Sequence, residues 1–394
     1  MTQSLRISIV VRDFAPGRTG LQPWSFFGSL ARALKEEGHH LTIWTDSGGD
    51  EVWNGVPVLV AKTPRPLYGS QTLHRIAVEM HQDALVVPFS WRFARTLVGK
   101  QPLPRDLAVV GFSLGPSYEL FQLARRFASP ALIRETPKDL SHVANWLVRH
   151  LGVWAEAMPA LRKLMFLWEG DARLARLAGV SEGLCSVVSH PFDPFFLSDV
   201  SAKVTGGLLA SIPESDQRIV FAGPAESSRG LEDVMRVARI LRLGSSAQVL
   251  ALIRDPAQSN LRVSMGRVGE NDLVQVRGVL PRDDLREIFS RASVVCLPYH
   301  FVRSGFPKTI LDAVAAGAIV VTTPVYPLTE LRGRTGIGFA ETHRPRDIAE
   351  RIRTLIESRS ETLRLKRLNQ DWLESCPTWS DLAQMVSRAI TTGE

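Results

Sequence analysis

The chain has 394 residues, of which 45% are hydrophobic and 22% are charged, so it can bury a large core and a disordered protein is excluded. Its 47 Lys and Arg residues against 40 Asp and Glu residues give a net charge of +7, which can attract phosphorylated ligands or an anionic membrane surface. Basic runs with interleaved aromatic residues are absent at the density of nucleic-acid-binding proteins, so nucleic acid is not expected as a partner.

The cysteines indicate a reducing compartment. Cys185, Cys296 and Cys376 are too few and too scattered for a disulfide framework, and no CxxC spacing offers a metal site. The first residues run directly into a strand-like segment without the features of a signal peptide, and no uncharged apolar stretch approaches the roughly 18 to 20 residues of a membrane span. We therefore expect a cytoplasmic protein, soluble or peripheral at the inner face of the membrane, with no metal site.

Short apolar runs rich in Val and Ile alternate with longer amphipathic stretches along the chain, which predicts parallel sheets covered by helices on both faces. The first series of strands is expected at 5–11, 40–45, 57–61, 85–89, 107–113 and 185–189. The second series is expected at 218–223, 248–253, 273–276, 293–298 and 318–323. The pattern predicts an α/β protein with two doubly wound domains.

A polar stretch rich in Gly and Ser, at 197–217, separates the two series and marks the domain boundary. We expect a first domain over 1–197, a second over 198–375 and a final helical segment over 376–394. Open parallel sheets bind ligands beyond the carboxyl ends of their strands. The active site is therefore expected between the two domains.

The second domain opens with RIVFAGPAESSRGLEDV, which predicts a strand, a loop and a helix that starts near Arg229–Gly230. Residues just before such a helix present free backbone N–H groups and the positive end of its dipole to a bound anion. Arg229 adds a full positive charge at this point. The alternative is that Arg229 is a solvated surface residue.

A second strand, loop and helix follow over 276–322, and this helix is expected to start near Gly305. Gly305 permits close approach of the backbone to a ligand, and Pro307 suits the first turn of a helix. The backbone N–H groups of Phe306, Lys308 and Thr309 would then point toward an anion.

The side chains of this helix add charge to the same place. Lys308 would bring an ammonium beside the anion. Asp312, eight residues after Ser304 and so on nearly the same face of the helix, could accept hydrogen bonds from sugar hydroxyls.

These segments together resemble the retaining GT-B glycosyltransferases of family 4. That family shows G-R-x…K-G, then E-G-F-G…E-A, then A-x-G-x-P-V-V. Here RGLEDV, SGFPKTILDA and AAGAIVVTTPVYPLTEL occur in the same order, and CSVVSHPFDPFF at 185–196 resembles the family's interdomain segment. The resemblance covers most of 180–345.

The resemblance implies a GT-B fold of two Rossmann-like domains facing each other, with the final helix returning to the first domain. It also implies transfer of a sugar from a nucleoside-diphosphate sugar to a hydroxyl of a glycan, lipid-linked or small acceptor, with retention and without a metal or other cofactor, in polysaccharide, glycolipid or glycoconjugate biosynthesis. By position, Arg229 would hold the diphosphate with help from Lys308, and Asp312 would hold the ribose.

The resemblance assigns further residues to donor binding. Arg254 ends a preceding strand, and Val279 lies where such enzymes read the base through backbone groups. In the first domain the family has a glycine-rich turn, for which Gly17, Thr19 and Gly20 are the candidates. The remaining donor-binding candidates are in the loop before the second helix: Ser304, Gly305, Phe306, Pro307 and Thr309.

Three residues depart from the family pattern. Ser304 replaces the first glutamate, Asp312 replaces the second, and Pro224 stands where an arginine is expected after Gly223. These departures leave a second interpretation open, in which the chain is a catalytically silent GT-B subunit that binds or stabilises a partner transferase. A GT-B epimerase or phosphorylase is a third interpretation.

The first domain offers weaker signals. The family has a histidine near the donor sugar in its first domain, and no residue of this chain can be assigned to it. His81 and His142 are weak candidates. The loop at 111–118 could contact the acceptor. The segment 139–176 mixes Trp, Leu and Met with basic residues at helical spacing, which fits either interior packing or contact with an anionic membrane.

Overall fold

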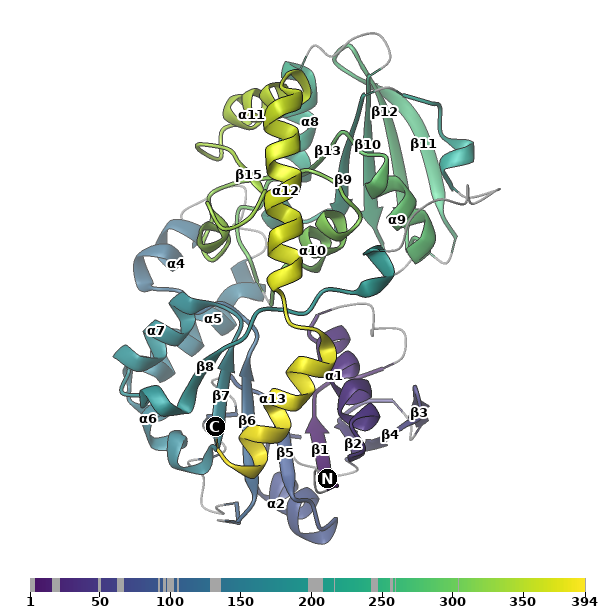
Figure 1. The fold of residues 1–394 in the computed structure, drawn as a ribbon. Helices are drawn as coiled ribbons and strands as arrows, with labels where there is room; N and C mark the ends of the chain where they lie inside the picture. The colour runs from purple at the N-terminus through teal and green to yellow at the C-terminus, as the bar shows by residue number, and fades with distance from the viewer. Residues whose placement is uncertain are drawn as a thin grey trace.

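The computed structural model describes residues 4–15, 22–48, 51–61, 67–90, 93–94, 97, 103–104, 106–127, 136–197, 208–215, 217–241, 247–255, 258, 260–303 and 305–393. It contains two α/β domains, drawn one above the other in Figure 1, each built on its own sheet. The candidate residues Gly17, Thr19, Gly20 and Ser304 lie outside the described residues.

The first sheet has eight strands in the order β3-β4-β2-β1-β5-β6-β7-β8, and all neighbours are parallel except the edge pair β3 and β4. The strands are β1 (Arg6–Val10), β2 (His40–Thr45), β3 (Glu51–Trp53), β4 (Val56–Val60), β5 (Ala84–Pro88), β6 (Ala108–Ser113), β7 (Lys163–Phe166) and β8 (Cys185–Val187). The helices of this domain are α1 (Trp24–Glu36), α2 (Ser70–Glu79), α4 (Leu120–Phe127), α5 (Thr136–His150), α6 (Val153–Ala157) and α7 (Glu169–Leu177).

The second sheet has seven strands in the order β11-β12-β10-β9-β13-β14-β15, with β11 antiparallel at one edge. The strands are β9 (Gln217–Gly223), β10 (Ala247–Arg254), β11 (Arg262–Val268), β12 (Asn271–Gly278), β13 (Val294–Leu297), β14 (Val320–Thr322) and β15 (Gly338–Phe339). The helices that follow or cover them are α8 (Leu231–Ile240), α9 (Arg282–Ser290), α10 (Lys308–Ala315), α11 (Pro345–Glu357) and α12 (Arg359–Ser375).

The expected alternation of strands and helices is confirmed in both domains. Central strands such as β6 are buried along their whole length, because helices cover both faces of a parallel sheet. One expectation was wrong in part: the segment 139–176 is not uniformly helical, because the buried strand β7 interrupts it.

The last helix, α13 (Trp379–Thr391), packs against α1 and β6 of the first domain (Figure 1). A reciprocal capping box between Thr378 and Asp381 fixes its start. Ser387 of this helix shares a hydrogen bond of 2.8 Å with the buried His39 of the first domain. The chain thus passes between the domains twice, once before β9 and once between α12 and α13.

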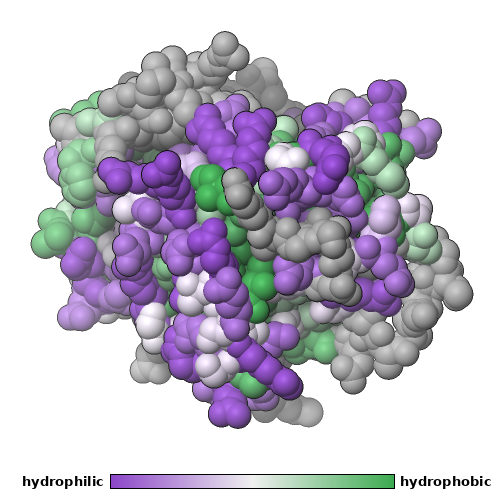
Figure 2. All heavy atoms as spheres, turned by 90° about the horizontal axis from the view of Figure 1, so that it is seen from above, coloured by the Kyte–Doolittle hydropathy of each residue, from purple (hydrophilic) through white to green (hydrophobic). Residues whose placement is uncertain are grey.

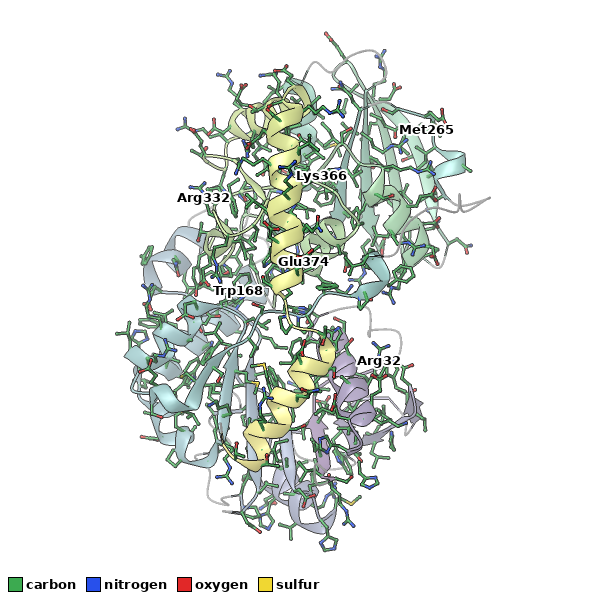
Figure 3. The ribbon with its side chains drawn as sticks, in the orientation of Figure 1. Arg32, Trp168, Met265, Arg332, Lys366 and Glu374 are labelled. Atoms are coloured by element: carbon green, nitrogen blue, oxygen red, sulfur yellow. The ribbon has the colours of Figure 1, made fainter. Side chains whose placement is uncertain are left out.

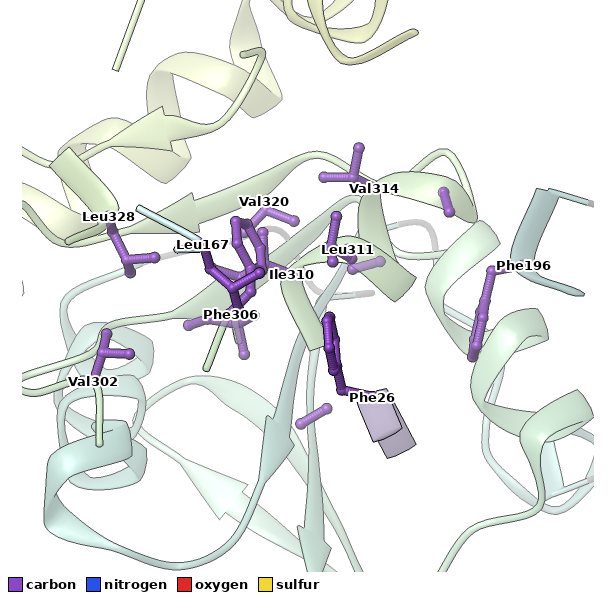
Figure 4. Close-up of a cluster of buried hydrophobic side chains, with 14 of the residues drawn as sticks. Phe26, Leu167, Phe196, Val302, Phe306, Ile310, Leu311, Val314, Val320 and Leu328 are labelled. Carbon is purple, nitrogen blue, oxygen red and sulfur yellow. The ribbon is translucent and has the colours of Figure 1, made fainter. Parts of the chain in front are cut away.

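The domains share apolar core at their junction. Figure 4 shows Phe26 of α1 beside Phe306, Ile310 and Leu311 of the second domain. Trp168, which lies at the junction in Figure 3, stacks on Phe306 with 5.0 Å between ring centroids. Within the described ranges, no helix combines the length and apolar character that a membrane crossing requires.

Candidate donor site at the strand ends of the second sheet

The site is built where neighbouring strands of the second sheet end together. Arg254, the last residue of β10, is in register with Gly278 of β12, and Ile253 is in register with Gly223, the last residue of β9. Because parallel strands end at one edge of a sheet, the loops that follow these strands converge. The loop after β9 leads through a short 3-10 turn, Ser227–Arg229, into α8.

Gly230 locks this loop against the loop that follows β13. Its φ is +78°, and a Cβ at this position would lie 2.1 Å from the carbonyl oxygen of Pro298. The backbone N–H of His300 donates to the carbonyl of Ser228 at 2.9 Å, which ties the same two loops together. Any residue larger than glycine would push the loops apart.

The guanidinium of Arg229 lies over the ring of Tyr299, with 5.1 Å between Cζ and the ring centroid. Tyr299 itself is buried, so its ring gives the arginine a fixed apolar support. Burial and then the nearby positive charge of Arg229 lower the pKa of Arg254. Two guanidinium groups are thus held close enough to repel each other, and no ion pair joins either one to a carboxylate in the described part of the chain.

A cross-loop ion pair lies next to these arginines. Arg303 donates to Glu226 at 2.6 Å, which links the loop after β13 to the residue that precedes the 3-10 turn. The backbone of Arg303 also approaches the first domain, because a Cβ on Gly115 would lie 3.8 Å from its carbonyl oxygen. The ion pair therefore links the loop that leads to Arg229 with a loop whose backbone approaches the first domain.

The same loop is fixed to the first domain by an aromatic contact. Tyr118 stacks on Phe301 with 4.3 Å between ring centroids, and its hydroxyl donates to the carbonyl of Val302 at 2.5 Å. His142 meets both rings edge-on, at 5.2 Å and 5.3 Å. The loop at 111–118, expected as an acceptor contact, here positions the loop after β13.

The start of α10 packs into the domain junction. Gly305 has a φ of +58° and lies against the side chain of Gln22 in the first domain. Phe306 is buried on Trp168, so its side chain serves packing, and Pro307 is the N-cap of α10. Thr309, in the first turn of α10, is partly exposed.

Lys308 lies among carboxylates. Its Nζ contacts Oδ1 and Oδ2 of Asp312 at 2.7 Å and 2.8 Å, and lies 3.9 Å from Oδ2 of Asp193 in the interdomain segment. Burial raises the pKa of Asp312 to about 6, against the lowering effect of Lys308. These residues line a water-sized cavity of about 20 Å³ with His190 and Trp379. Lys308 therefore lies against the interdomain segment, whereas Arg229 lies against Tyr299.

The structure thus brings together only part of the predicted set. Arg229 and Arg254 are close, and Val279 follows β12 directly and is exposed. Lys308 and Asp312 pair with each other instead of presenting separate groups to a ligand. His81 is exposed on the first domain.

Sequence reasoning missed Tyr299, Glu226 and Arg303. Tyr299 comes two residues after the last residue of β13, a position where side chains reach the ligand side of a sheet, so it could have been named. The ion pair between Glu226 and Arg303 depends on how two loops pack. In the described residues, no group of three or more His, Cys, Asp or Glu side chains is placed to hold a metal ion.

Part of the chain matches a known protein family. Residues 216–358, which contain the candidate site, match the family model described as glycosyl transferases group 1. That match covers less than half of the chain. No curated protein has a significantly similar sequence.

Solved structures resemble the whole chain. WaaG, a glycosyltransferase involved in lipopolysaccharide biosynthesis, is 14% identical, with a TM-score of 0.64 over 98% of this chain and 100% of that one. HepE of Anabaena in complex with UDP and glucose is 12% identical, with a TM-score of 0.66 over 98% and 100%. Sucrose-phosphate synthase of Thermosynechococcus elongatus is 13% identical, with a TM-score of 0.70 over 98% of both chains.

The chain therefore has the GT-B fold, as the sequence predicted, and residues 216–358 of its second domain are similar to glycosyl transferases group 1. Membership of family 4 and retention of configuration stay predictions.

Proposed function

We propose that this chain is a metal-independent glycosyltransferase that moves a sugar from a nucleoside-diphosphate sugar to an acceptor hydroxyl with retention. The observation that carries the proposal is the closeness of Arg229 and Arg254 at the strand ends, with no described carboxylate in an ion pair with either. Two neighbouring cations are destabilising unless an anion binds between them. A diphosphate fits this requirement, because guanidinium groups bind phosphate oxygens through paired N–H donors.

Sugar transfer requires positive charge at the diphosphate. Sugar transfer separates an oxocarbenium-like sugar from a diphosphate leaving group, so negative charge grows on the diphosphate in the transition state. Arg229 is fixed on Tyr299 and Arg254 ends a buried strand, so both are in place before that charge develops. Losing one such preorganised donor costs on the order of 2.7 to 4 kcal/mol of transition-state stabilisation.

The role of Lys308 in the proposal changes with the structure. The positive charge of Lys308 is already compensated by the carboxylate of Asp312 and lies close to that of Asp193. We therefore assign the diphosphate to Arg229 and Arg254. Lys308 and Asp312 would hold the start of α10, so that the backbone at Gly305 and Thr309 faces the phosphates.

Glu226 and Arg303 are proposed to bind the donor sugar. Ser304 cannot supply the carboxylate that the family uses at its position. Glu226 provides a carboxylate that is oriented by Arg303 at 2.6 Å, and the backbone of Arg303 approaches the first-domain loop at Gly115. Carboxylates accept hydrogen bonds from sugar hydroxyls.

A lipid-linked or glycan acceptor at the inner face of the membrane is also proposed. The side of the first domain formed by α4 and α5 exposes Phe121, Leu140, Leu147 and Leu151, the last 65% exposed. Exposed apolar side chains on surface helices suit peripheral contact with a membrane. WaaG, which shares the fold, acts in lipopolysaccharide biosynthesis.

One observation favours the second candidate, a silent subunit that stabilises a partner transferase. The carboxylate of Asp312, assigned to the donor ribose by resemblance, is held by Lys308 on both oxygens. A donor nucleotide would have to break the ion pair between Lys308 and Asp312, or bind without a contact to Asp312.

Turnover distinguishes the candidates. The purified chain is incubated with UDP-, GDP- and dTDP-sugars, and release of the nucleoside diphosphate is followed with the Arg229→Ala variant as control. Release that depends on Arg229 supports the transferase. No release with any donor, together with unchanged donor affinity in the variant, would reject it, while isomerised donor or phosphate consumption would indicate an epimerase or phosphorylase.

A further inference from the structure

A second basic site lies at the far end of α8. Four arginines, Arg236, Arg239, Arg344 and Arg346, surround a hollow of about 590 Å³ with Ile240 and Pro345. α8 and α11, which supply these residues, pack against each other at the end of the second domain away from the first (Figure 1). Figure 2 views this end, where hydrophilic side chains cover most of the described surface.

On α8, the hollow lies toward the end of the helix opposite Arg229. Arg229 directly precedes α8, whereas Arg239 and Ile240 end it. Ten helical residues span about 15 Å at 1.5 Å per residue. One helix therefore carries a basic site at each end.

The positive charge in the hollow is largely uncompensated. Arg236 contacts Asp233 at 3.3 Å and Glu232 at 3.7 Å. Among the described residues, Arg239, Arg344 and Arg346 form no ion pair with a carboxylate. Three arginines that line one hollow thus form no ion pair with a described carboxylate.

The helices do not explain all of this charge. Arginines in the last turn of α8 are favourable, because the carboxyl end of a helix carries partial negative charge. At α11 the opposite holds, since Arg344 is the N-cap and Arg346 is in the first turn, where cations oppose the helix dipole. Only Asp347 in that turn has the favourable sign.

We propose that this hollow binds a soluble small molecule that carries at least two phosphate groups. The arginines of both helices would bind the phosphates, because each guanidinium offers paired N–H donors that match phosphate oxygens. Ile240 and Pro345 give the hollow an apolar wall for the rest of the ligand. A volume of about 590 Å³ is in the range of small-molecule sites, roughly 300 to 1,000 Å³.

The test is calorimetric titration of the full chain with inorganic tripolyphosphate. The double variant Arg239→Gln, Arg344→Gln removes one guanidinium from each helix. Its control is Arg262→Gln, Arg267→Gln, which removes the same charge from exposed positions on β11. We expect affinity to fall at least tenfold in the first variant and less than twofold in the control, with UDP-sugar affinity unchanged in both.

Three outcomes overturn the proposal. Equal loss in both double variants would indicate an effect of net charge, and loss in Arg229→Ala alone would place tripolyphosphate at the donor site. Binding of wild-type protein to anionic vesicles that the Arg239→Gln, Arg344→Gln variant abolishes, without saturable binding of tripolyphosphate, would assign the hollow to lipid headgroups. Failure of the proposed transferase function is seen separately, as missing UDP-sugar binding.

Discussion

The ring of Tyr299 supports the guanidinium of Arg229, whose Cζ lies 5.1 Å from the ring centroid, and so fixes this cation at the end of β13. Arg254 reaches the same place from β10, where the charge of Arg229 contributes to its lowered pKa. This relationship defines a two-arginine anion site.

Arg254→Ala should weaken binding of the donor about 10- to 100-fold, since a hydrogen bond to a charged group contributes about 1.5 to 3 kcal/mol. Calorimetry with the donor found by screening measures the effect. Arg267→Ala, at an exposed position at the other end of β11, is the matched control and should bind as the wild type does. Equal affinity of both variants would remove Arg254 from the site.

Glu226→Gln should weaken binding of the sugar nucleotide several-fold while leaving binding of the nucleoside diphosphate unchanged. The reason is that the proposed contact of Glu226 is to the sugar, and Arg303 orients its carboxylate at 2.6 Å. Parallel titrations with the sugar nucleotide and the diphosphate separate the two contributions. If both affinities fall by the same factor, Glu226 acts on the diphosphate loop and not on the sugar.

Gly230→Ala should destabilise the protein and lower donor affinity together. A new Cβ would lie 2.1 Å from the carbonyl oxygen of Pro298, and the positive φ of +78° adds roughly 1 to 2 kcal/mol for a non-glycine residue. Gly317→Ala separates these effects, because Gly317 has a φ of +81° with open space around it. Thermal unfolding of the two variants should show a larger loss for Gly230→Ala, and equal losses would contradict the steric argument.

Asp171→Asn should flatten the pH dependence of stability between about pH 4 and pH 8. Asp171 is fully buried, accepts from the backbone N–H of Ser117 and the hydroxyl of Tyr326, and burial raises its pKa to about 8. A raised carboxyl pKa means that the folded protein holds the proton more tightly. Its contribution is therefore fully present below about pH 4 and is lost as the pH rises through 8.

Urea unfolding at pH 5 and pH 8 checks this prediction. We expect the wild type to lose about 1 to 3 kcal/mol more than the variant over this interval, since each pKa unit corresponds to about 1.4 kcal/mol. The neighbouring Arg149 and Glu330 are present in both proteins, so their titration cancels in the comparison. Identical profiles would show that Asp171 is ionised in the folded protein.

The fold could be predicted because strands buried on both faces appear in sequence as continuous apolar runs, as in β6 and β10. Four strands escaped prediction for physical reasons. β3 and β15 have only three and two residues, β7 is short and lies inside a segment with helical spacing, and β11 is an edge strand that is exposed along nearly all of its length.

The site was predictable where it depends on local sequence and not where it depends on packing between loops. Arg229 follows from a strand, a loop and a helix start. Glu226 and Arg303 meet only because Gly230 lets two loops close together. The ion pair between Lys308 and Asp312 could also have been predicted, because residues four apart on a helix are neighbours.

The most direct test of the central claim is the affinity of the wild type and of Arg229→Ala for the UDP-, GDP- and dTDP-sugars, measured by thermal stabilisation and then by calorimetry. A ligand that binds only the folded state raises its stability in proportion to the logarithm of its concentration over Kd. We predict that at least one sugar nucleotide stabilises the wild type and that Arg229→Ala loses at least tenfold in affinity for it. Equal affinity of the two proteins for every donor would contradict the account.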